Sequence, residues 1–146
     1  MPQIVPVAVE HEARWRELYR GYATFYGREL TDAHAEVVWG WLQDPGRELE
    51  GRLALADGRP VGLAHFRRMP SPLRGADIGF LDDLFVDPGT RARGVGRALI
   101  EAVAAVARER GWSLVRWHTA DDNYRARALY DRLAAKTTWN LYELAV

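Results

Sequence analysis

The feature that most constrains the fold is a strand that passes through a glycine-containing turn into a long amphipathic helix. The apolar run at 78–86 is typical of a strand, and the Asp-Pro-Gly sequence at 87–89 ends it. Gly94 and Gly96 follow, flanked by arginines. A helix after them is indicated by apolar residues spaced four, four and three apart, which form one helical face: Val95, Leu99, Val103 and Val106.

Three phosphate-binding loops could explain the two glycines. A Walker A loop needs Gly-Lys-Ser/Thr, but Gly96 is followed by arginine and alanine. A dinucleotide fingerprint needs a third glycine or alanine where Leu99 stands, and it should fall earlier in the chain. The third is the pattern Arg-x-x-Gly-x-Gly over 91–96, where free N–H groups at the helix start could hold a pyrophosphate. From these six residues alone, a tight turn with exposed arginines is an equally good explanation.

The remaining sequence predicts further helices and strands in the order β-α-α-β-β-β-α-β-α-β. Turn residues Asp57 and Gly58 indicate a hairpin over 49–68, and the Pro- and Gly-rich stretch at 69–77 predicts a loop. The predicted helices are 10–27, 31–43, 95–110 and 124–136, the last of them with Asn123 at its start. The other predicted strands are 3–9, 78–86, 112–119 and 137–146.

Composition narrows the class of protein. The 146 residues contain no cysteine, which excludes disulfides, a thiol nucleophile and cysteine-based metal sites. Basic and acidic residues balance at 20 each, so nothing favours nucleic acid or an acidic membrane as a partner. The four histidines lack metal-ligand spacing, and no metal is expected. We expect one domain over 1–146, cytoplasmic, without a targeting or membrane-spanning segment.

Two segments carry a resemblance to a known family. "DDLFVDPGTRARGVGRALI" and "WHTADDNYRARALYDRL" resemble the acyl-CoA-binding signature and the second cofactor segment of the GNAT superfamily of N-acetyltransferases. The resemblance implies an α/β (α+β) fold with a mixed, mostly antiparallel central sheet flanked by helices and splayed between its fourth and fifth strands. It also implies acetyl-CoA as co-substrate. The chain departs from the family pattern at Leu133-Ala134-Ala135, where Leu-Gly-Phe is usual.

The resemblance assigns roles on the cofactor side. The main chain of residues 92–97 would hold the pyrophosphate, and an N–H near Leu84 to Val86 would polarise the thioester carbonyl. Tyr130 matches the family's tyrosine, which protonates the leaving thiolate. The cofactor-binding residues expected on this basis are Leu84, Phe85, Val86, Arg91, Ala92, Arg93, Gly94, Val95, Gly96, Arg97, Asn123 and Tyr130.

The amine must lose a proton, and the neighbouring carboxylates Asp82 and Asp83 are the candidates. Adjacent strand residues face opposite ways, so only one can point into the cleft unless a bulge intervenes. Asp82 lies where polyamine-acetylating relatives carry a glutamate, which favours it as base or water relay, with Asp83 structural or substrate-orienting. The alternative is that both simply pair with arginines such as Arg67 or Arg116.

The acceptor is least defined by the sequence. Tyr26, Arg28 and His118 are candidate substrate contacts, from the loop that walls this site in the family and from a strand end. The acidic pair predicts direct acetyl transfer to the primary amine of a small cationic molecule or lysine-like acceptor, including a peptide lysine. A neutral or antibiotic amine is an alternative, as is a non-catalytic acyl-CoA-binding regulatory module. A homodimer is also expected, with Trp139 as a candidate contact.

Overall fold

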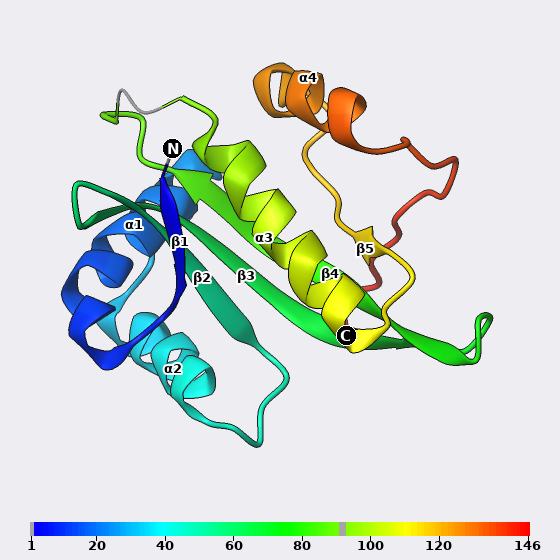
Figure 1. The fold of residues 1–146 in the computed structure, drawn as a ribbon, viewed down its shortest axis with the longest axis horizontal. Coiled ribbons are helices and arrows are strands. Elements are labelled where there is room, and N and C mark those ends of the chain that lie inside the picture. Colours follow the sequence, from blue (N-terminus) through cyan, green and yellow to red (C-terminus); the bar gives the residue numbers. More distant parts are fainter. Residues whose placement is uncertain (1, 91–92) are drawn as a thin grey trace.

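The computed structural model describes residues 2–90 and 93–146 (Figure 1). Arg91 and Ala92, two of the expected cofactor contacts, lie outside the described residues. A 3-10 turn, Val9–His11, precedes the first helix. The helices and strands are β1 (Gln3–Pro6), α1 (Glu12–Phe25), α2 (Asp32–Gln43), β2 (Glu50–Ala56), β3 (Arg59–Ser71), β4 (Ala76–Val86), α3 (Val95–Arg110), β5 (Val115–Arg116) and α4 (Tyr124–Leu133).

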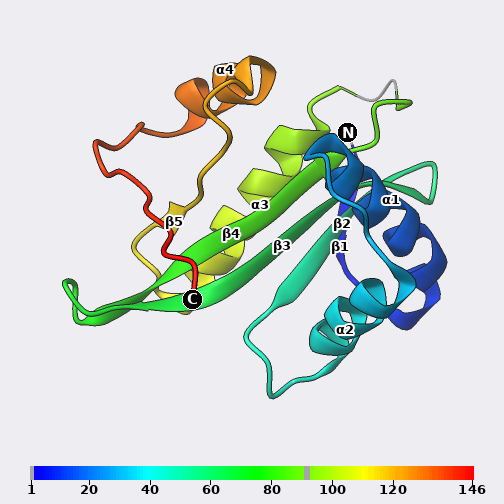
Figure 2. The ribbon, with the colours of Figure 1, turned by 180° about the vertical axis from the view of Figure 1, so that it is seen from behind.

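The strands form one sheet in the order β1-β2-β3-β4-β5, antiparallel except for the parallel pair β4 and β5. Helix α3 covers one face, and α1 and α2 cover the other (Figures 1 and 2). Alternation along the strands supplies both cores, because successive side chains point to opposite faces. Leu53 and Leu63 pack with Trp15 beneath α1 and α2, whereas Ala54 and Ala64 pack beneath α3.

The hairpin between β2 and β3 matches the prediction. Asp57 and Gly58 both have positive φ, 50° and 76°, as a two-residue turn between twisted strands requires. The predicted loop at 69–77 is wrong over most of its length. Strands β3 and β4 continue as a paired ladder to Ser71 and Ala76, and only residues 72–75 form the turn. The pairing of two long strands outweighs the local preference of proline and glycine for a loop.

The C-terminal third departs further from the prediction. Strand β5 pairs with β4 only at Val115 and Arg116, not over 112–119. Helix α4 ends at Leu133, and the predicted strand at 137–146 is absent. Apolar side chains of this segment are exposed, and a strand needs a neighbouring strand to satisfy its main-chain groups. The exposed side chains are Trp139, Leu141, Tyr142, Leu144 and Val146.

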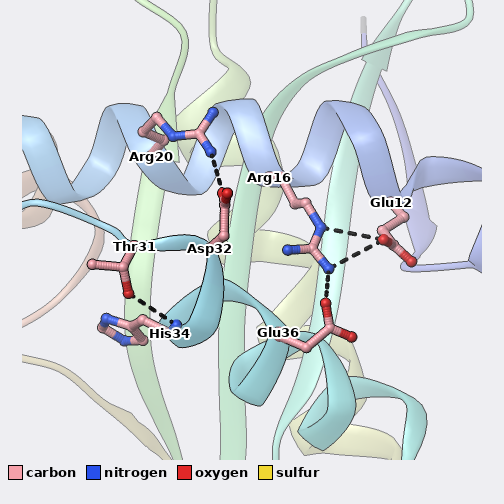
Figure 3. Close-up of polar contacts among 7 residues, drawn as sticks. All are labelled: Glu12, Arg16, Arg20, Thr31, Asp32, His34 and Glu36. Carbon is pink, nitrogen blue, oxygen red and sulfur yellow. Dashed lines mark hydrogen bonds and ion pairs between the residues drawn. The ribbon is translucent and has the colours of Figure 1, made fainter.

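Capping and ion pairs fix the connection between α1 and α2 (Figure 3). The Thr31 hydroxyl accepts a hydrogen bond from the His34 N–H, as expected of an N-cap. Arg16 on α1 bonds Glu36 on α2 at 2.7 Å and Glu12 at 3.2 Å. Exposed ion pairs add little stability, but they set how the two helices lie. Among the described residues, no helix is long and apolar enough to cross a membrane.

Candidate active site

The sheet opens between β4 and β5. Pairing ends at Phe80 and Arg116, so the rest of β4 has no neighbour on that edge. The Asp87 N–H bonds the Val61 carbonyl on β3 at 2.8 Å. Because main-chain groups alternate between the two edges of a strand, the N–H groups of Leu84 and Val86 face the gap.

Phe85 lies differently from these two neighbours. The same alternation turns its N–H toward β3. Its ring packs against α1, edge-on to Tyr22 with ring centroids 6.3 Å apart. A Cβ at Gly21 would lie 2.9 Å from this ring, so glycine lets α1 approach β4 closely. Of the three residues expected at the thioester, Leu84 and Val86 therefore present free N–H groups, and Phe85 joins α1 to β4.

A β-bulge separates the two acidic residues of β4. His65 on β3 faces Asp83 and Phe66 faces Leu81, which leaves Asp82 without a partner on β3. A bulge of this kind re-aims the side chain of the extra residue. Asp82 lines a pocket beside α1, and Asp83 bonds to side chains that also line that pocket. Both carboxylates consequently serve the same region of the molecule.

Asp82 is half-buried and paired. Its carboxylate accepts hydrogen bonds from Arg67 Nε at 3.0 and 3.2 Å, which is the arginine pairing considered from sequence. The Arg67 guanidinium lies 4.9 Å from the ring centroid of Phe80. Burial raises the pKa of Asp82 and outweighs the opposing effect of Arg67. A raised pKa makes this carboxylate a better proton acceptor, because base strength increases with pKa.

Asp83 is more buried and more strongly bonded. His65 Nδ1 lies 2.8 Å from its Oδ2, and the hydroxyls of Tyr19 and Tyr22 interact with the same carboxylate. Burial opposes ionisation, but hydrogen bonding from His65 and the two phenols lowers the pKa of Asp83. The same contacts and burial raise the pKa of both tyrosines. Asp83 is thus ionised at neutral pH and is a weaker base than Asp82.

A pocket of about 530 Å³ joins these residues to the N-terminal helices. It contains Asp82 and the three residues predicted as acceptor contacts, Tyr26, Arg28 and His118. The other lining residues are Tyr19, Tyr22, Ala23, Glu29, Leu30, His34, Thr119 and Ala120. The structure therefore brings together four predicted site residues from three separate segments of the chain.

A larger hollow of about 750 Å³ lies at the opposite end of α3, beside Arg110 and Arg68. Two of its three arginines are paired, because Arg68 bonds Glu48 and Asp77 and Arg110 bonds Glu50. The third, Arg47, lies over the Trp41 ring. It contains none of the predicted site residues. We therefore place the chemistry in the smaller pocket despite its size.

Arg28 lines this pocket without a charged partner among the described residues. Within the part of the chain that the structure describes, its guanidinium has no ion pair and no hydrogen bond. It follows Gly27, whose φ of 68° ends α1 and turns the chain into the pocket wall. An unpaired guanidinium at a pocket is available to bind a carboxylate in a bidentate manner.

The N-terminus of α3 forms the other side of the gap. Gly94 is the N-cap with φ of 75°, and no acidic residue occurs in the first turn. A Cβ at Gly96 would lie 3.4 Å from Leu129 on α4 and 3.9 Å from Val86 on β4. A Cβ at these distances would make ordinary van der Waals contacts, so Gly96 packs closely between α4 and β4. The first N–H groups of α3 have no partner within the helix, and a helix start of this kind can bind a pyrophosphate.

Arg97 is held on the surface of α3. Arg97 bonds Glu101 at 2.8 Å, as the sequence predicts for a pair one turn apart. Its guanidinium is therefore engaged on the helix surface. The main-chain groups of residues 94–97 are the anion-binding feature that the described part of the loop offers.

Tyr130 and Asn123 lie on α4 and at its start. The Tyr130 ring packs edge-on to Trp117 with centroids 5.4 Å apart. Burial raises the pKa of Tyr130 to about 12, with a smaller contribution from Tyr26, so the phenol stays protonated at neutral pH. Asn123 occupies the N-cap position, but its side chain makes no capping bond and donates instead to Thr119 Oγ1 at 3.3 Å.

Sequence reasoning missed the groups behind Asp83. His65, Trp15, Tyr19 and Tyr22 form a polar cluster between β3, β4 and α1. Only one weak signal existed in the sequence, a histidine within the otherwise apolar run at 61–66. Across the described ranges, no three His, Cys, Asp or Glu side chains gather closely enough to hold a metal ion.

Comparison with known proteins gives consistent results. Residues 14–135 match the model of the Acetyltransferase (GNAT) family. The chain is 33% identical over 145 residues to a D-amino-acid N-acetyltransferase of Saccharomyces cerevisiae, covering 97% of this chain and 90% of the relative.

Solved structures agree in fold. A ribosomal-protein-alanine N-acetyltransferase from Brucella melitensis superimposes with a TM-score of 0.83 at 27% identity, covering 100% of this chain and 99% of that one. An aminoglycoside N-acetyltransferase in complex with CoA gives a TM-score of 0.81 at 25% identity, covering 100% and 95%. The mixed, mostly antiparallel fold expected from the resemblance is thereby confirmed.

Proposed function

Because the chain belongs to the acetyltransferase (GNAT) family, we propose that it acetylates the primary amine of a free amino acid, with acetyl-CoA as co-substrate. The observation that carries the choice of acceptor is the charge pattern of the pocket. It combines two carboxylates, Asp82 and Glu29, with the unpaired guanidinium of Arg28. Of the two carboxylates, Asp82 is paired with Arg67. An amino acid carries the complementary pair of charges.

This proposal narrows the cationic acceptor expected from sequence. That expectation treated Asp82 and Asp83 as free negative charges. The positive charge of Arg67 offsets the charge of Asp82, and the carboxylate of Asp83 interacts with His65, Tyr19 and Tyr22. With Arg28 added, the pocket is not strongly acidic, and a polycation gains less there than a zwitterion. The yeast relative whose name specifies D-amino acids supports the same class of acceptor.

Acetyl-CoA supplies an activated thioester, and residues of this chain are arranged to hold it. The N-terminus of α3 provides N–H groups and a positive dipole for the diphosphate. The glycines at 94 and 96 allow close approach. The free N–H groups of Leu84 and Val86 lie where β4 borders the gap, and we assign to them the polarisation of the thioester carbonyl.

Two side chains handle the protons. Asp82 accepts one proton from the ammonium, directly or through a water, so that the nitrogen can form the new C–N bond. Tyr130 donates its phenolic proton to the sulfur as the C–S bond breaks. The nitrogen of the adduct loses its second proton to the Tyr130 phenolate, directly or through water, and Asp82 passes its proton to solvent. The products are then a neutral amide, a neutral thiol and one released proton. No covalent acyl-enzyme is required, in agreement with the absence of cysteine.

The test is release of free CoA with a panel of acceptors: D- and L-amino acids, their amides, polyamines, lysine peptides and aminoglycosides. We expect the amino acids to have the highest kcat/KM and their amides to be poorer. Arg28→Gln should raise KM for amino acids about tenfold and leave KM for the amides unchanged, since only the former present a carboxylate. Arg74→Gln, an exposed arginine at the tip of the β3–β4 turn, is the matched control.

The contrary results are specific. Faster turnover of polyamines than of any amino acid would contradict this proposal and favour the cationic acceptor expected from the sequence. An equal effect of Arg28→Gln on amino acids and amides would remove the role of Arg28 in carboxylate binding.

A further inference from the structure

A chain of buried hydrogen bonds lies directly behind the acceptor pocket. Trp15 Nε1 donates to His65 Nε2 at 2.9 Å, and His65 Nδ1 lies 2.8 Å from Asp83 Oδ2. Trp15 and His65 are both fully buried, with 0% of their surfaces exposed. The first two members come from α1 and β3, and the third comes from β4. Neither the cofactor contacts nor the proton transfers proposed above use Trp15 or His65.

The donors and acceptors fix the state of His65. An indole N–H can only donate, so Nε2 of His65 must carry a lone pair. The ring proton is then on Nδ1 and is donated to the Asp83 carboxylate. His65 is therefore a neutral imidazole in one tautomer. The titratable and charged groups placed against it are Asp83 and Asp82 from β4 and Tyr19 from α1.

Asp83 in turn determines how the hydroxyls of Tyr19 and Tyr22 can form hydrogen bonds. An ionised carboxylate only accepts, so the hydroxyls of Tyr19 and Tyr22, which both interact with Asp83, can meet it only as donors. A phenol that donates its single proton retains oxygen lone pairs and becomes an acceptor toward any other partner. Tyr19 and Tyr22 both line the pocket that contains Asp82. The pocket therefore presents two phenol oxygens as acceptors close to one carboxylate.

We propose that Tyr19 and Tyr22, held by Asp83, select a primary amine by accepting its two remaining N–H bonds after Asp82 has taken the first proton. An ammonium group has three protons, which match these three acceptors. A secondary amine has one N–H too few, and an alcohol has none left after deprotonation. Asp83, His65 and Trp15 act through the phenols as positioning residues. This inference rests on the proposed function for the identity of the base.

The first test uses kinetics of the full chain with a primary amino acid and its N-methyl derivative. We expect wild type to prefer the primary amine. Tyr19→Phe and Tyr22→Phe should each raise KM for the primary amine about tenfold, the effect of one lost hydrogen bond to a charged group. Each should also reduce the preference over the N-methyl compound and leave KM for acetyl-CoA unchanged. Tyr142→Phe, in the exposed C-terminal segment, is the control.

The second test reads His65 itself, by ¹⁵N-detected NMR of its imidazole. We expect a ring with its proton on Nδ1 and a lone pair on Nε2. Trp15→Phe removes the donor to Nε2 and should shift the Nε2 resonance. His65→Asn keeps an N–H that can reach Asp83 and should retain more selectivity than His65→Leu. A thermal melt of each variant identifies any that fail to fold.

Unchanged amine KM and unchanged N-methyl discrimination in both phenylalanine variants would overturn the inference. A His65 signal with its proton on Nε2, or a charged ring at neutral pH, would overturn it as well. Failure of the proposed function is distinguishable. The chain could acetylate another primary amine and no amino acid, which would contradict the proposed function. The same tests would then use that amine, and discrimination against its N-methyl form would show whether Tyr19 and Tyr22 select a primary amine.

Discussion

The two sides of the gap between β4 and β5 are built on different principles. On the proposed cofactor side, the groups available for binding are main-chain N–H groups of α3 and β4. On the acceptor side, ionisable and aromatic side chains from α1, β3 and β4 form a bonded network. We assign to the first side the binding of the co-substrate, which is common to the family. The second side is expected to bind one particular acceptor.

The difference has a consequence for mutation. Main-chain binding is insensitive to most side-chain changes and fails only when the backbone is forced to move. A side-chain network responds to single-atom changes, because each lost partner leaves a buried group unsatisfied.

The largest effect is expected from Gly94→Val. A β-branched residue is strongly disfavoured at φ of 75°, so the start of α3 must rearrange. We expect acetyl-CoA affinity, measured by calorimetry, to fall about 100-fold as several charge-assisted hydrogen bonds are lost together. Arg97→Ala should change affinity little, because Glu101 already holds that guanidinium. If Arg97→Ala were the more damaging, side chains rather than main chain would hold the diphosphate.

Asp82→Asn tests the acid–base assignment on the acceptor side. General base catalysis is worth at least about 100-fold, and we expect kcat to fall by that order with acetyl-CoA affinity intact. In wild type, activity should fall as pH decreases through the raised pKa of Asp82, because the protonated acid accepts no proton. The Asp82→Asn variant should not show this loss of activity at low pH. If Asp83→Asn removed the loss of activity at low pH instead, the base would be Asp83.

Tyr130→Phe tests the acid on the cofactor side. Loss of the phenolic proton donor should lower kcat about 100-fold or somewhat less, since water can partly substitute in an open gap. With a pKa of about 12, the phenol of wild type remains protonated through the alkaline range in which proteins are usually assayed. We therefore expect no loss of activity from Tyr130 ionisation below about pH 10. Unchanged kcat in Tyr130→Phe would exclude this tyrosine as the acid.

The neighbouring carboxylates should have opposite effects on stability as pH changes. The pKa of Asp83 is lowered by folding, so its stabilisation is present above the unfolded pKa and is lost as pH falls through the folded one. The pKa of Asp82 is raised, so its ionisation opposes folding as pH rises. In urea denaturation, Asp83→Asn should cost on the order of 2 kcal/mol near neutral pH and less near pH 3.

Asp82→Asn serves as the comparison for the preceding measurement. Its cost should be smaller at neutral pH than at pH 3, because the variant avoids burying a charge. The same trend with pH in both variants would contradict the different environments that the structure gives the two residues.

The smallest effect on stability is expected from deleting residues 137–146. Their apolar side chains are exposed, so the free energy of unfolding should change by less than about 1 kcal/mol. The homodimer stays a prediction, and the same deletion tests it. If Trp139 lies in a dimer contact, light scattering should show twice 16.6 kDa for the full chain and a monomer after deletion. A full chain of 16.6 kDa alone would remove the prediction.

Much of the fold follows from local chemistry. The turn at Asp57 and Gly58, the N-cap Thr31 and the helix starting after Gly94 were all predictable, because each depends on the dihedral preferences of a few adjacent residues. The errors fell where distant partners decide. The β3–β4 ladder extended through a segment rich in proline and glycine, and the C-terminal segment found no neighbouring strand.

The candidate site divides in the same way. Tyr26, Arg28, His118 and Asp82 were expected singly, and the pocket brings them together. The bulge at Asp82 could not be predicted, because it exists only in the register between β3 and β4. The role of Asp83 depends on Trp15 and His65, which are 50 residues apart in the chain and 2.9 Å apart in the structure.

The sequence by itself determined the cofactor end of this protein. Glycines at 94 and 96, an Asp-Pro turn and an amphipathic helix act within one continuous segment, and main-chain geometry there depends on nearby residues. Only the tertiary structure decided the acceptor end. Which proton each phenol, imidazole and carboxylate carries depends on neighbours from α1, β3 and β4, and no spacing along the chain encodes which of them will meet.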